Sequence, residues 1–210
     1  MKTEKVVVFD VDGTLFDTKP GIIKTLNEVL ESFGSNSIKQ SHEYNWIGPP
    51  VRDSFKNFAK LSEEQAEEAT KLYRKLYIEK YISYSFLYDG MAEVLKKLKK
   101  NNVHICIATM KTSEQMERLL FLNNMNDIFE SVKTAANDGS KTKADMLREI
   151  KIKFGEELGY YMVGDTEGDL VAAKSEKYSF LAALYGYGNF QGLQDITKID
   201  NPRQLLLFKW

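Results

Sequence analysis

The feature that most constrains the fold is an apolar run near the N-terminus that ends in two aspartates. Residues 6–9 read V-V-V-F, which is typical of a strand buried on both faces of a parallel sheet. Asp10 and Asp12 follow this run, and Gly13 and Thr14 after them break the strand and let backbone approach a ligand. Because two carboxylates this close repel each other, a cation or a shared proton has to relieve the cost. The run therefore predicts either an acidic turn that caps a core strand or a metal site.

Strand-like and helical patterns alternate in the second half of the chain. Further strands are predicted at residues 103–108, 131–135, 160–163 and 180–185. Helices are predicted at residues 91–101, 116–122, 142–153, 170–175 and 202–208, with a polar turn at 137–140. This alternation is the pattern of an α/β protein with a parallel sheet.

A helical block interrupts this pattern after the first strand. From about residue 20 to residue 83 the apolar spacing is helical and no strand is indicated, which predicts a separate small domain inserted into the sheet domain. We therefore expect a doubly wound parallel sheet with an inserted all-helical domain. The predicted boundaries are residues 1–18 and 86–210 for the α/β core and residues 19–85 for the helical domain.

Composition excludes several classes of function. With 210 residues and 43% hydrophobic residues the chain can bury a sizeable core, and its net charge of −1 argues against a nucleic-acid partner. The single cysteine, Cys106, lies in an apolar run and is expected to be a buried, inert thiol. No signal-type or membrane-length apolar stretch is present. We expect a cytoplasmic protein without a membrane partner, as a monomer or homodimer.

Polar side chains follow several of the predicted strands. Asp10 and Asp12 follow the first, Thr109 ends the second, and Asp165 and Asp169 follow the fourth. A lysine precedes the helix that leads into the fourth strand. Because the carboxyl ends of parallel strands line one crevice, these groups are expected to converge.

The run D-V-D-G-T-L-F-D-T at residues 10–18, together with these later motifs in this order, resembles the haloacid dehalogenase-like (HAD) phosphohydrolases. The likeness is to the branch that includes phosphoglycolate phosphatase and β-phosphoglucomutase. It implies a HAD-like Rossmannoid core, a helical cap of the C1 type, and a Mg²⁺-dependent phosphatase that acts on small phosphorylated substrates through an aspartyl-phosphate. A phosphomutase and a catalytically silent binding or regulatory protein are the alternatives.

The resemblance also implies roles for the acidic residues. Asp10 is the expected nucleophile, and Asp12 is the expected general acid and base. Asp10, the backbone carbonyl of Asp12 and Asp165 are the expected Mg²⁺ ligands. Asp169 is expected to support them.

The phosphate is expected to contact Gly13, Thr109, Met110 and a lysine. The segment after residue 139 lacks the Lys-Pro-x-Pro form common in this branch and offers two lysines. Lys143 fits members that use Lys-x-Asp here, so it is favoured over Lys141, which stays a supporting candidate.

Two cationic residues of the helical domain are candidates for contacting the rest of the substrate. Arg52 ends the stretch W-I-G-P-P-V-R, which resembles the cap loop that faces the active site, and Lys19 directly follows the first motif. A bidentate arginine suits a second charged group of the substrate. The alternative for Arg52 is a surface arginine in the first turn of a helix.

Overall fold

The N-terminal apolar run is the central strand of the larger of two units. The computed structural model describes residues 4–136 and 140–210, so the turn predicted at 137–140 falls for the most part outside the described residues. One unit consists of Met1–Asp17 and Leu87–Trp210, and the other of Thr18–Phe86. Thr18 and Phe86 thus belong to the helical unit, whereas the sequence had placed them at the edges of the core.

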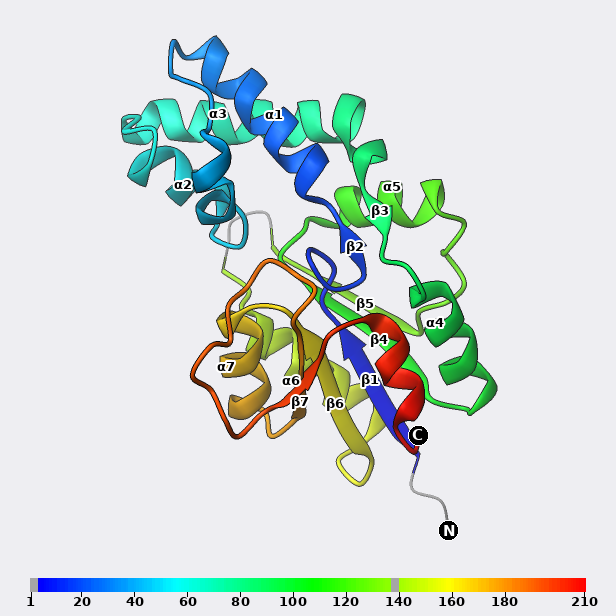
Figure 1. Ribbon diagram of the computed structural model, residues 1–210. Helices are drawn as coiled ribbons and strands as arrows, with labels where there is room; N and C mark the ends of the chain where they lie inside the picture. The colour runs from blue at the N-terminus through cyan, green and yellow to red at the C-terminus, as the bar shows by residue number, and fades with distance from the viewer. Residues whose placement is uncertain (1–3, 137–139) are drawn as a thin grey trace. The chain divides into compact units, whose positions relative to one another are not determined.

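The larger unit is built on a six-stranded sheet in the order β5-β4-β1-β6-β7-β8, in which all neighbours are parallel (Figure 1). Its strands are β1 (Lys5–Phe9), β4 (His104–Thr109), β5 (Ser131–Thr134), β6 (Gly159–Gly164), β7 (Ser179–Ala183) and β8 (Thr197–Ile199). Val8 of β1 lies opposite Cys106 on one side and Met162 on the other. The chain builds outward from β1 to β5 and then returns to build the other side from β6, so β1 lies at the switch point where α/β sheets bind ligands.

Helices cover this sheet, which confirms the prediction of a doubly wound α/β core. They are α4 (Met91–Lys100), α5 (Ser113–Leu122), α6 (Lys143–Phe154), α7 (Glu167–Ser175) and the 3₁₀ helix η4 (Pro202–Leu207). Val6 and Val8 join one hydrophobic cluster with Leu147 of α6 and Leu170 of α7. Val7, which points to the opposite face of the sheet, is also fully buried. β1 is therefore enclosed on both faces.

The predicted elements shift at the C-terminal end of the sheet. β7 ends at Ala183, two residues earlier than predicted, and the chain then turns across the strand ends. The sixth strand, β8, was not predicted, because its three residues are too few to show an alternating pattern. The last helix is of the 3₁₀ type and ends at Leu207.

All the regular structure of the smaller unit between Lys19 and Tyr84 is helical. It contains α1 (Lys19–Ser32), the 3₁₀ helix η1 (Gln40–Trp46), α2 (Val51–Asn57), α3 (Glu63–Leu76), the π-helix η2 (Tyr77–Tyr81) and the 3₁₀ helix η3 (Ile82–Tyr84). Its interior includes Leu26 of α1, Phe55 of α2 and Tyr77. At the two ends of the segment, β2 (Phe16–Asp17) pairs with β3 (Phe86–Leu87). Among the described residues, no helix is long and apolar enough to cross a bilayer.

Candidate active site

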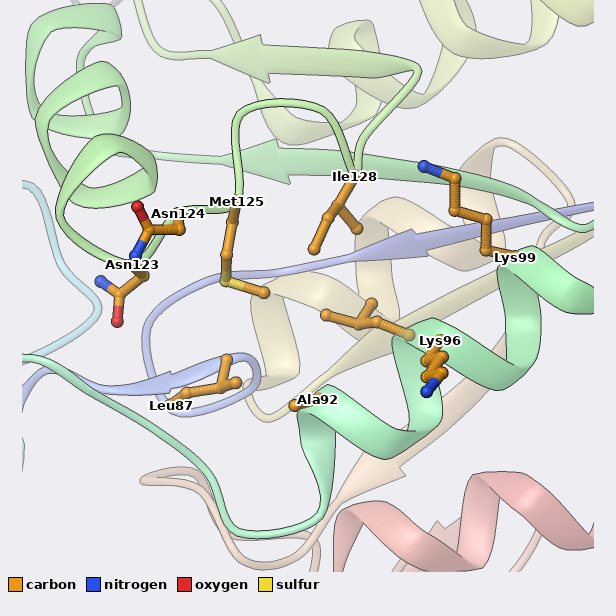
Figure 2. A pocket seen from close by; sticks show the side chains of 9 residues that line it. Leu87, Ala92, Lys96, Lys99, Asn123, Asn124, Met125 and Ile128 are labelled. Atoms are coloured by element: carbon orange, nitrogen blue, oxygen red, sulfur yellow. The ribbon is translucent and has the colours of Figure 1, made fainter.

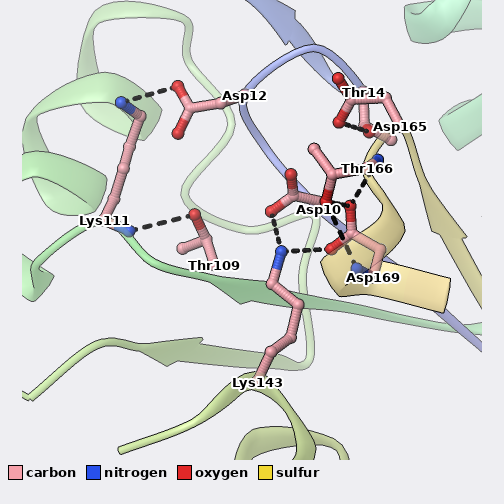
Figure 3. Close-up of polar contacts among 9 residues, drawn as sticks. All are labelled: Asp10, Asp12, Thr14, Thr109, Lys111, Lys143, Asp165, Thr166 and Asp169. Atoms are coloured by element: carbon pink, nitrogen blue, oxygen red, sulfur yellow. Dashed lines mark hydrogen bonds and ion pairs between the residues drawn. The ribbon is translucent and has the colours of Figure 1, made fainter. Parts of the chain in front are cut away.

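Three buried carboxylates meet at the carboxyl end of β1. The backbone N–H of Asp10 donates to the carbonyl of Val163 at 2.9 Å, which ties the end of β1 to β6. Asp165 follows β6, and Asp169 lies in the first turn of α7. One carboxylate oxygen from each of these three aspartates lies within 4.8 Å of the others (Figure 3). Two strand ends and one helix start thus converge where the parallel topology predicts a ligand crevice.

Lys143 joins this acid cluster from the first position of α6. The side chain of Thr142 caps the helix by accepting from the backbone N–H of Asp145, which fixes where α6 begins. The ammonium of Lys143 lies 2.8 Å from Oδ1 of Asp10 and also donates to Asp169 (Figure 3). Burial works to lower the pKa of Lys143, but the charges of these two carboxylates raise it above its usual value. Lys143 is therefore a fixed cation beside Asp10.

Lys141, the other candidate, lies elsewhere. Its ammonium pairs with Glu149 of α6 at 2.8 Å, and Lys133 of β5 pairs with the same carboxylate at 2.7 Å. The structure thus brings Lys143 to the acid cluster and pairs Lys141 with Glu149 of α6. The sequence favoured Lys143 because it lies at the start of the predicted helix and matches the Lys-x-Asp form of some family members.

Asp165 is held by groups that the sequence did not point to. Thr14 donates its hydroxyl to Oδ1 at 3.2 Å, and the backbone N–H of Tyr187 donates to Oδ2 at 2.7 Å. A Cβ at Gly13 would lie 2.1 Å from Oδ2, and one at Gly188 would lie 1.8 Å from the Asp165 carbonyl. The loop after β7 therefore closes over Asp165. Its Y-G-Y-G sequence was the available signal, because alternating glycines after a strand suggest close backbone approach.

The acid cluster carries more negative charge than its lysine balances. Burial raises the pKa of Asp10 well above its usual value, and the charges of Asp169 and Asp165 add to this, while Lys143 opposes it. Burial and the charge of Asp169 raise the pKa of Asp165 to about 7. A hard divalent cation would relieve this repulsion, and Mg²⁺ prefers carboxylate oxygens of this kind. The residues present therefore fit a magnesium ion.

Asp12 lies outside that set of three carboxylates. Its Oδ1 is 2.9 Å from the ammonium of Lys111, a lysine whose side chain is only 5% exposed. The hydroxyl of Thr109, at the end of β4, is buried and accepts from the backbone N–H of Lys111 at 3.2 Å. Lys111 was missed by the sequence reasoning, and a lone lysine after a strand offers no signal of its own.

The remaining predicted substrate contacts fall into two groups. In the larger unit, Gly13 has a φ of +78°, and Met110 is an exposed side chain directly after Thr109. In the helical unit, Arg52 pairs with Glu63, and its Nε lies 3.3 Å from Glu67. Arg52 is thus engaged by carboxylates of its own unit.

Lys19 is held in the same way within the helical unit. Its ammonium lies 3.2 Å from the carboxylate of Glu43 and donates to the hydroxyl of Tyr44 at 3.3 Å. The same ammonium lies 4.4 Å from the centre of the Tyr44 ring. For both cations, contact with a substrate remains a prediction.

A separate pocket of about 340 Å³ lies beside α4. Leu95, Met125 and Ile128 provide apolar lining, and Lys96 and Lys99 lie at the same pocket (Figure 2). None of the predicted site residues lines this pocket, and it contains no carboxylate. Its polar lining consists of Lys96, Lys99, Asn123 and Asn124, with no acidic side chain that could act as a nucleophile or metal ligand, so the acid cluster, and not this cavity, is the candidate active site.

A parallel sheet whose first strand ends in a lysine-bridged acid cluster defines a class of α/β proteins with a ligand site at the switch point. The family model described as haloacid dehalogenase-like hydrolase matches residues 7–183. The chain belongs to this family.

Individual relatives resemble the chain at moderate identity. It is 29% identical to tyrosine-protein kinase PtkA of Mycobacterium tuberculosis (strain ATCC 25618 / H37Rv) over 89% of this chain and 64% of that protein. It is 26% identical to phosphoglycolate phosphatase of Aquifex aeolicus (strain VF5) over 96% of this chain and 95% of that one. The crystal structure of a predicted phosphatase from Clostridium acetobutylicum superposes with a TM-score of 0.86 at 25% identity, covering 99% and 100% of the two chains. The chain thus spans somewhat less than two thirds of the mycobacterial relative.

Proposed function

We propose that this chain is a cytoplasmic, magnesium-dependent phosphatase that hydrolyses small phosphomonoesters, with residues 19–85 as its cap. The observation that carries the proposal is the buried group formed by Asp10, Asp165, Asp169 and Lys143 at the end of β1. Phosphoryl transfer needs little more than positioning and charge neutralisation. This group offers a carboxylate for attack, a fixed ammonium and oxygens that suit a divalent cation.

The first half-reaction uses Asp10 as the nucleophile. Its carboxylate oxygen attacks phosphorus in line, a bond forms between that oxygen and phosphorus, and the bond from phosphorus to the ester oxygen breaks. The electron pair of the broken bond leaves on the ester oxygen, which takes a proton from Asp12. The products are the free alcohol and an aspartyl-phosphate on Asp10.

The second half-reaction restores the enzyme. Water attacks the same phosphorus and gives a proton to Asp12, and the bond between phosphorus and Asp10 breaks, which returns the carboxylate and releases inorganic phosphate. In both steps Lys143 stabilises negative charge beside Asp10. Thr109 supports the same charge, because its hydroxyl oxygen accepts from a backbone N–H and its own proton can be donated to a phosphoryl oxygen.

Asp10, Asp165 and the backbone carbonyl of Asp12 would hold the magnesium ion, with Asp169 beside them. When bound, the ion would neutralise charge on the carboxylates and on the phosphoryl oxygens. The ammonium of Lys143 already donates to the carboxylate of Asp169 in a direct ion pair. The role of Asp169 is therefore to hold the lysine next to Asp10.

The substrate is proposed to be a small phosphate that resembles phosphoglycolate, a nucleotide or a sugar phosphate. The likeness to a phosphoglycolate phosphatase over nearly the whole chain supports phosphoglycolate as the first ester to test. Arg52 and Lys19 are proposed to contact the part of the substrate beyond the phosphate. Each would have to exchange a carboxylate of the helical unit for one on the substrate.

A second candidate is transfer of the phosphoryl group to an acceptor other than water. The relative named a tyrosine-protein kinase favours testing this, although the chain covers only 64% of that protein. A phosphomutase would use the same aspartyl-phosphate with a sugar hydroxyl in place of water. Release of inorganic phosphate at the steady-state rate distinguishes hydrolysis from both.

The test is a phosphate-release screen over these esters, with Mg²⁺ and with a chelator. We expect turnover only with Mg²⁺, and we expect Asp10→Asn to lower kcat by at least about 1,000-fold because it removes the nucleophile. Asp127→Asn is the matched control, since Asp127 is an exposed aspartate outside the cluster. Full turnover by Asp10→Asn, or no release from any ester by the wild-type chain, would contradict the proposal.

A further inference from the structure

The two aspartates of the first motif are each paired with a different lysine. Asp10 pairs with Lys143 inside the acid cluster, whereas Asp12 pairs with Lys111 outside the set of three neighbouring carboxylates (Figure 3). The sequence predicted one lysine beside the aspartates of the first motif, whereas in the described part of the chain Lys143 and Lys111 each pair with one of them. Lys111 has no role in the mechanism derived so far.

Lys111 is held in place by its own backbone. Its N–H donates to the hydroxyl of Thr109 at 3.2 Å, and its carbonyl accepts from the N–H of Ala135, just after β5, at 3.0 Å. Only 5% of its side chain is exposed. Most lysine side chains are flexible and keep their ammonium in water. Because the Lys111 side chain is buried and its backbone makes these two hydrogen bonds, we infer that Lys111 has a fixed position.

The partner of this fixed ammonium is the most exposed of the site aspartates. The side chain of Asp12 is 25% exposed, whereas that of Asp10 is 8% exposed and that of Asp169 is fully buried. An unrestrained carboxylate two residues from Asp10 could turn toward a bound cation and become a ligand. The Oδ1 of Asp12 instead pairs with Lys111 at 2.9 Å, outside the set of three neighbouring carboxylates.

We propose that Lys111 is a positioning residue that keeps the carboxylate of Asp12 out of the metal-binding group and places it for proton transfer. The inference rests on the proposed phosphatase function and assigns one further residue to its site. In its protonated form Asp12 gives its proton to the departing ester oxygen, and the carboxylate so formed, paired with Lys111, takes one proton from the attacking water. Lys111 acts on both transfers only through Asp12 and exchanges no proton itself.

The segment from Thr109 to Lys111 then has two functions in one turn. Thr109 presents its hydroxyl to the phosphoryl oxygens, and Lys111 two residues later sets the position of the proton-transfer group. Because the N–H of Lys111 bonds to the hydroxyl oxygen of Thr109, the two functions are fixed relative to each other. General acid–base catalysis contributes about 100- to 10,000-fold to rates, and its loss sets the size of the expected effect.

The test is a double-mutant cycle on kcat with Lys111→Met and Asp12→Asn. If Lys111 acts only through Asp12, Lys111→Met lowers kcat by about 100-fold with KM changed less than about 3-fold. The double variant is then no slower than Asp12→Asn alone, within about 3-fold, because the losses are not additive. Lys111→Arg, which keeps the charge, is expected to recover activity to within about 10-fold of wild type.

A control variant separates this role of Lys111 from the general effect of removing an ion pair near the sheet. Lys133→Met is the matched control, since Lys133 also forms an ion pair at the neighbouring strand but with Glu149; it is expected to leave kcat unchanged. If Lys111→Met does not fold, Lys111→Gln replaces it in the cycle, because glutamine can still hydrogen-bond to Asp12 but carries no charge.

If the wild-type chain is active, two outcomes would overturn the inference about Lys111 without contradicting the proposed function. One is a kcat for Lys111→Met within about 3-fold of wild type, and the other is a double variant whose loss is the product of the two single losses. A wild-type chain that releases no phosphate contradicts the proposed function as well.

Discussion

In the absence of divalent cations, the free energy of unfolding of the larger unit is expected to fall as pH rises. Asp165 is the main reason. Its pKa is raised from 3.8 to about 7 by burial and by the charge of Asp169. Between these values the unfolded chain releases the proton and the folded chain retains it, so the free energy of unfolding falls with rising pH. The loss begins above pH 3.8 and is complete above about pH 7. Asp10, whose pKa is also raised, acts in the same direction.

The size of the effect follows from the shift. A difference of about three pKa units corresponds to about 4 kcal/mol, of which about 2 to 3 kcal/mol is lost between pH 5 and pH 8. Other carboxylates, such as Asp89 and Glu149, have lowered pKa values and contribute the opposite slope at low pH. The effect of Asp165 is therefore measured as the difference between the wild-type chain and Asp165→Asn, which has no charge at that position at any pH.

The assay is urea unfolding in a chelator at pH 5 to 8, followed by tryptophan fluorescence. The chain has two tryptophans, and Trp46→Phe leaves Trp210, which is 5% exposed in the larger unit, as the only reporter. We expect wild type to lose about 2 to 3 kcal/mol relative to Asp165→Asn between pH 5 and pH 8. Saturating Mg²⁺ is expected to abolish this difference, because a bound cation offsets the buried charge.

Parallel stability curves for the two chains in the chelator would refute the reasoning. They would mean that the Asp165 carboxyl titrates near its ordinary pKa and that repulsion among the buried carboxylates does not destabilise the folded chain. A difference that persists in saturating Mg²⁺ would instead show that the cation binds elsewhere.

Three further predictions test single positions. Lys143→Met is expected to lower kcat by about 100- to 1,000-fold, because it removes the ammonium that stabilises charge beside the nucleophile; steady-state phosphate release measures this. Gly188→Ala would place a Cβ 1.8 Å from the Asp165 carbonyl, so we expect a loss of at least about 1 to 3 kcal/mol in the free energy of unfolding and weaker Mg²⁺ binding by calorimetry. Burial raises the pKa of the Cys106 thiol to about 12, so an aromatic disulfide reagent is expected to react with it only after unfolding in urea; rapid reaction of the folded chain would contradict this.

The sequence predicted the parts of the site that depend on topology. The run before Asp10 indicated a buried parallel strand, and the carboxyl ends of parallel strands meet at one edge of a sheet. These two observations were enough to predict that Asp10, Asp165 and Thr109 lie at the carboxyl end of the sheet. Between two nearby lysines, the resemblance to family members that use Lys-x-Asp favoured Lys143, and the cap formed by Thr142 is the physical reason that Lys143 begins the helix.

The parts that the sequence did not predict depend on contacts without a local pattern. Lys111 pairs with Asp12, which lies 99 positions earlier in the chain. A single sequence contains no pattern that predicts such a long-range pair. Tyr187 binds Asp165 through its backbone N–H, a group that every residue except proline has, so its identity gives no hint of the contact. Arg52 could be read as a substrate contact from its loop, but the nearby Glu63 and Glu67 compete for its charge.

The central place of β1 has a consequence for how the chain is made. β1 is the first strand of this sheet in chain order, yet its neighbours begin only at His104 and Gly159. Until most of the polypeptide has been synthesised, this apolar strand has no partner on one edge, while the helical segment Thr18–Phe86 can already form from contacts close in sequence. During translation this apolar strand therefore stays exposed until both neighbouring strands have been made, and chaperone binding to nascent chains is expected to concentrate there.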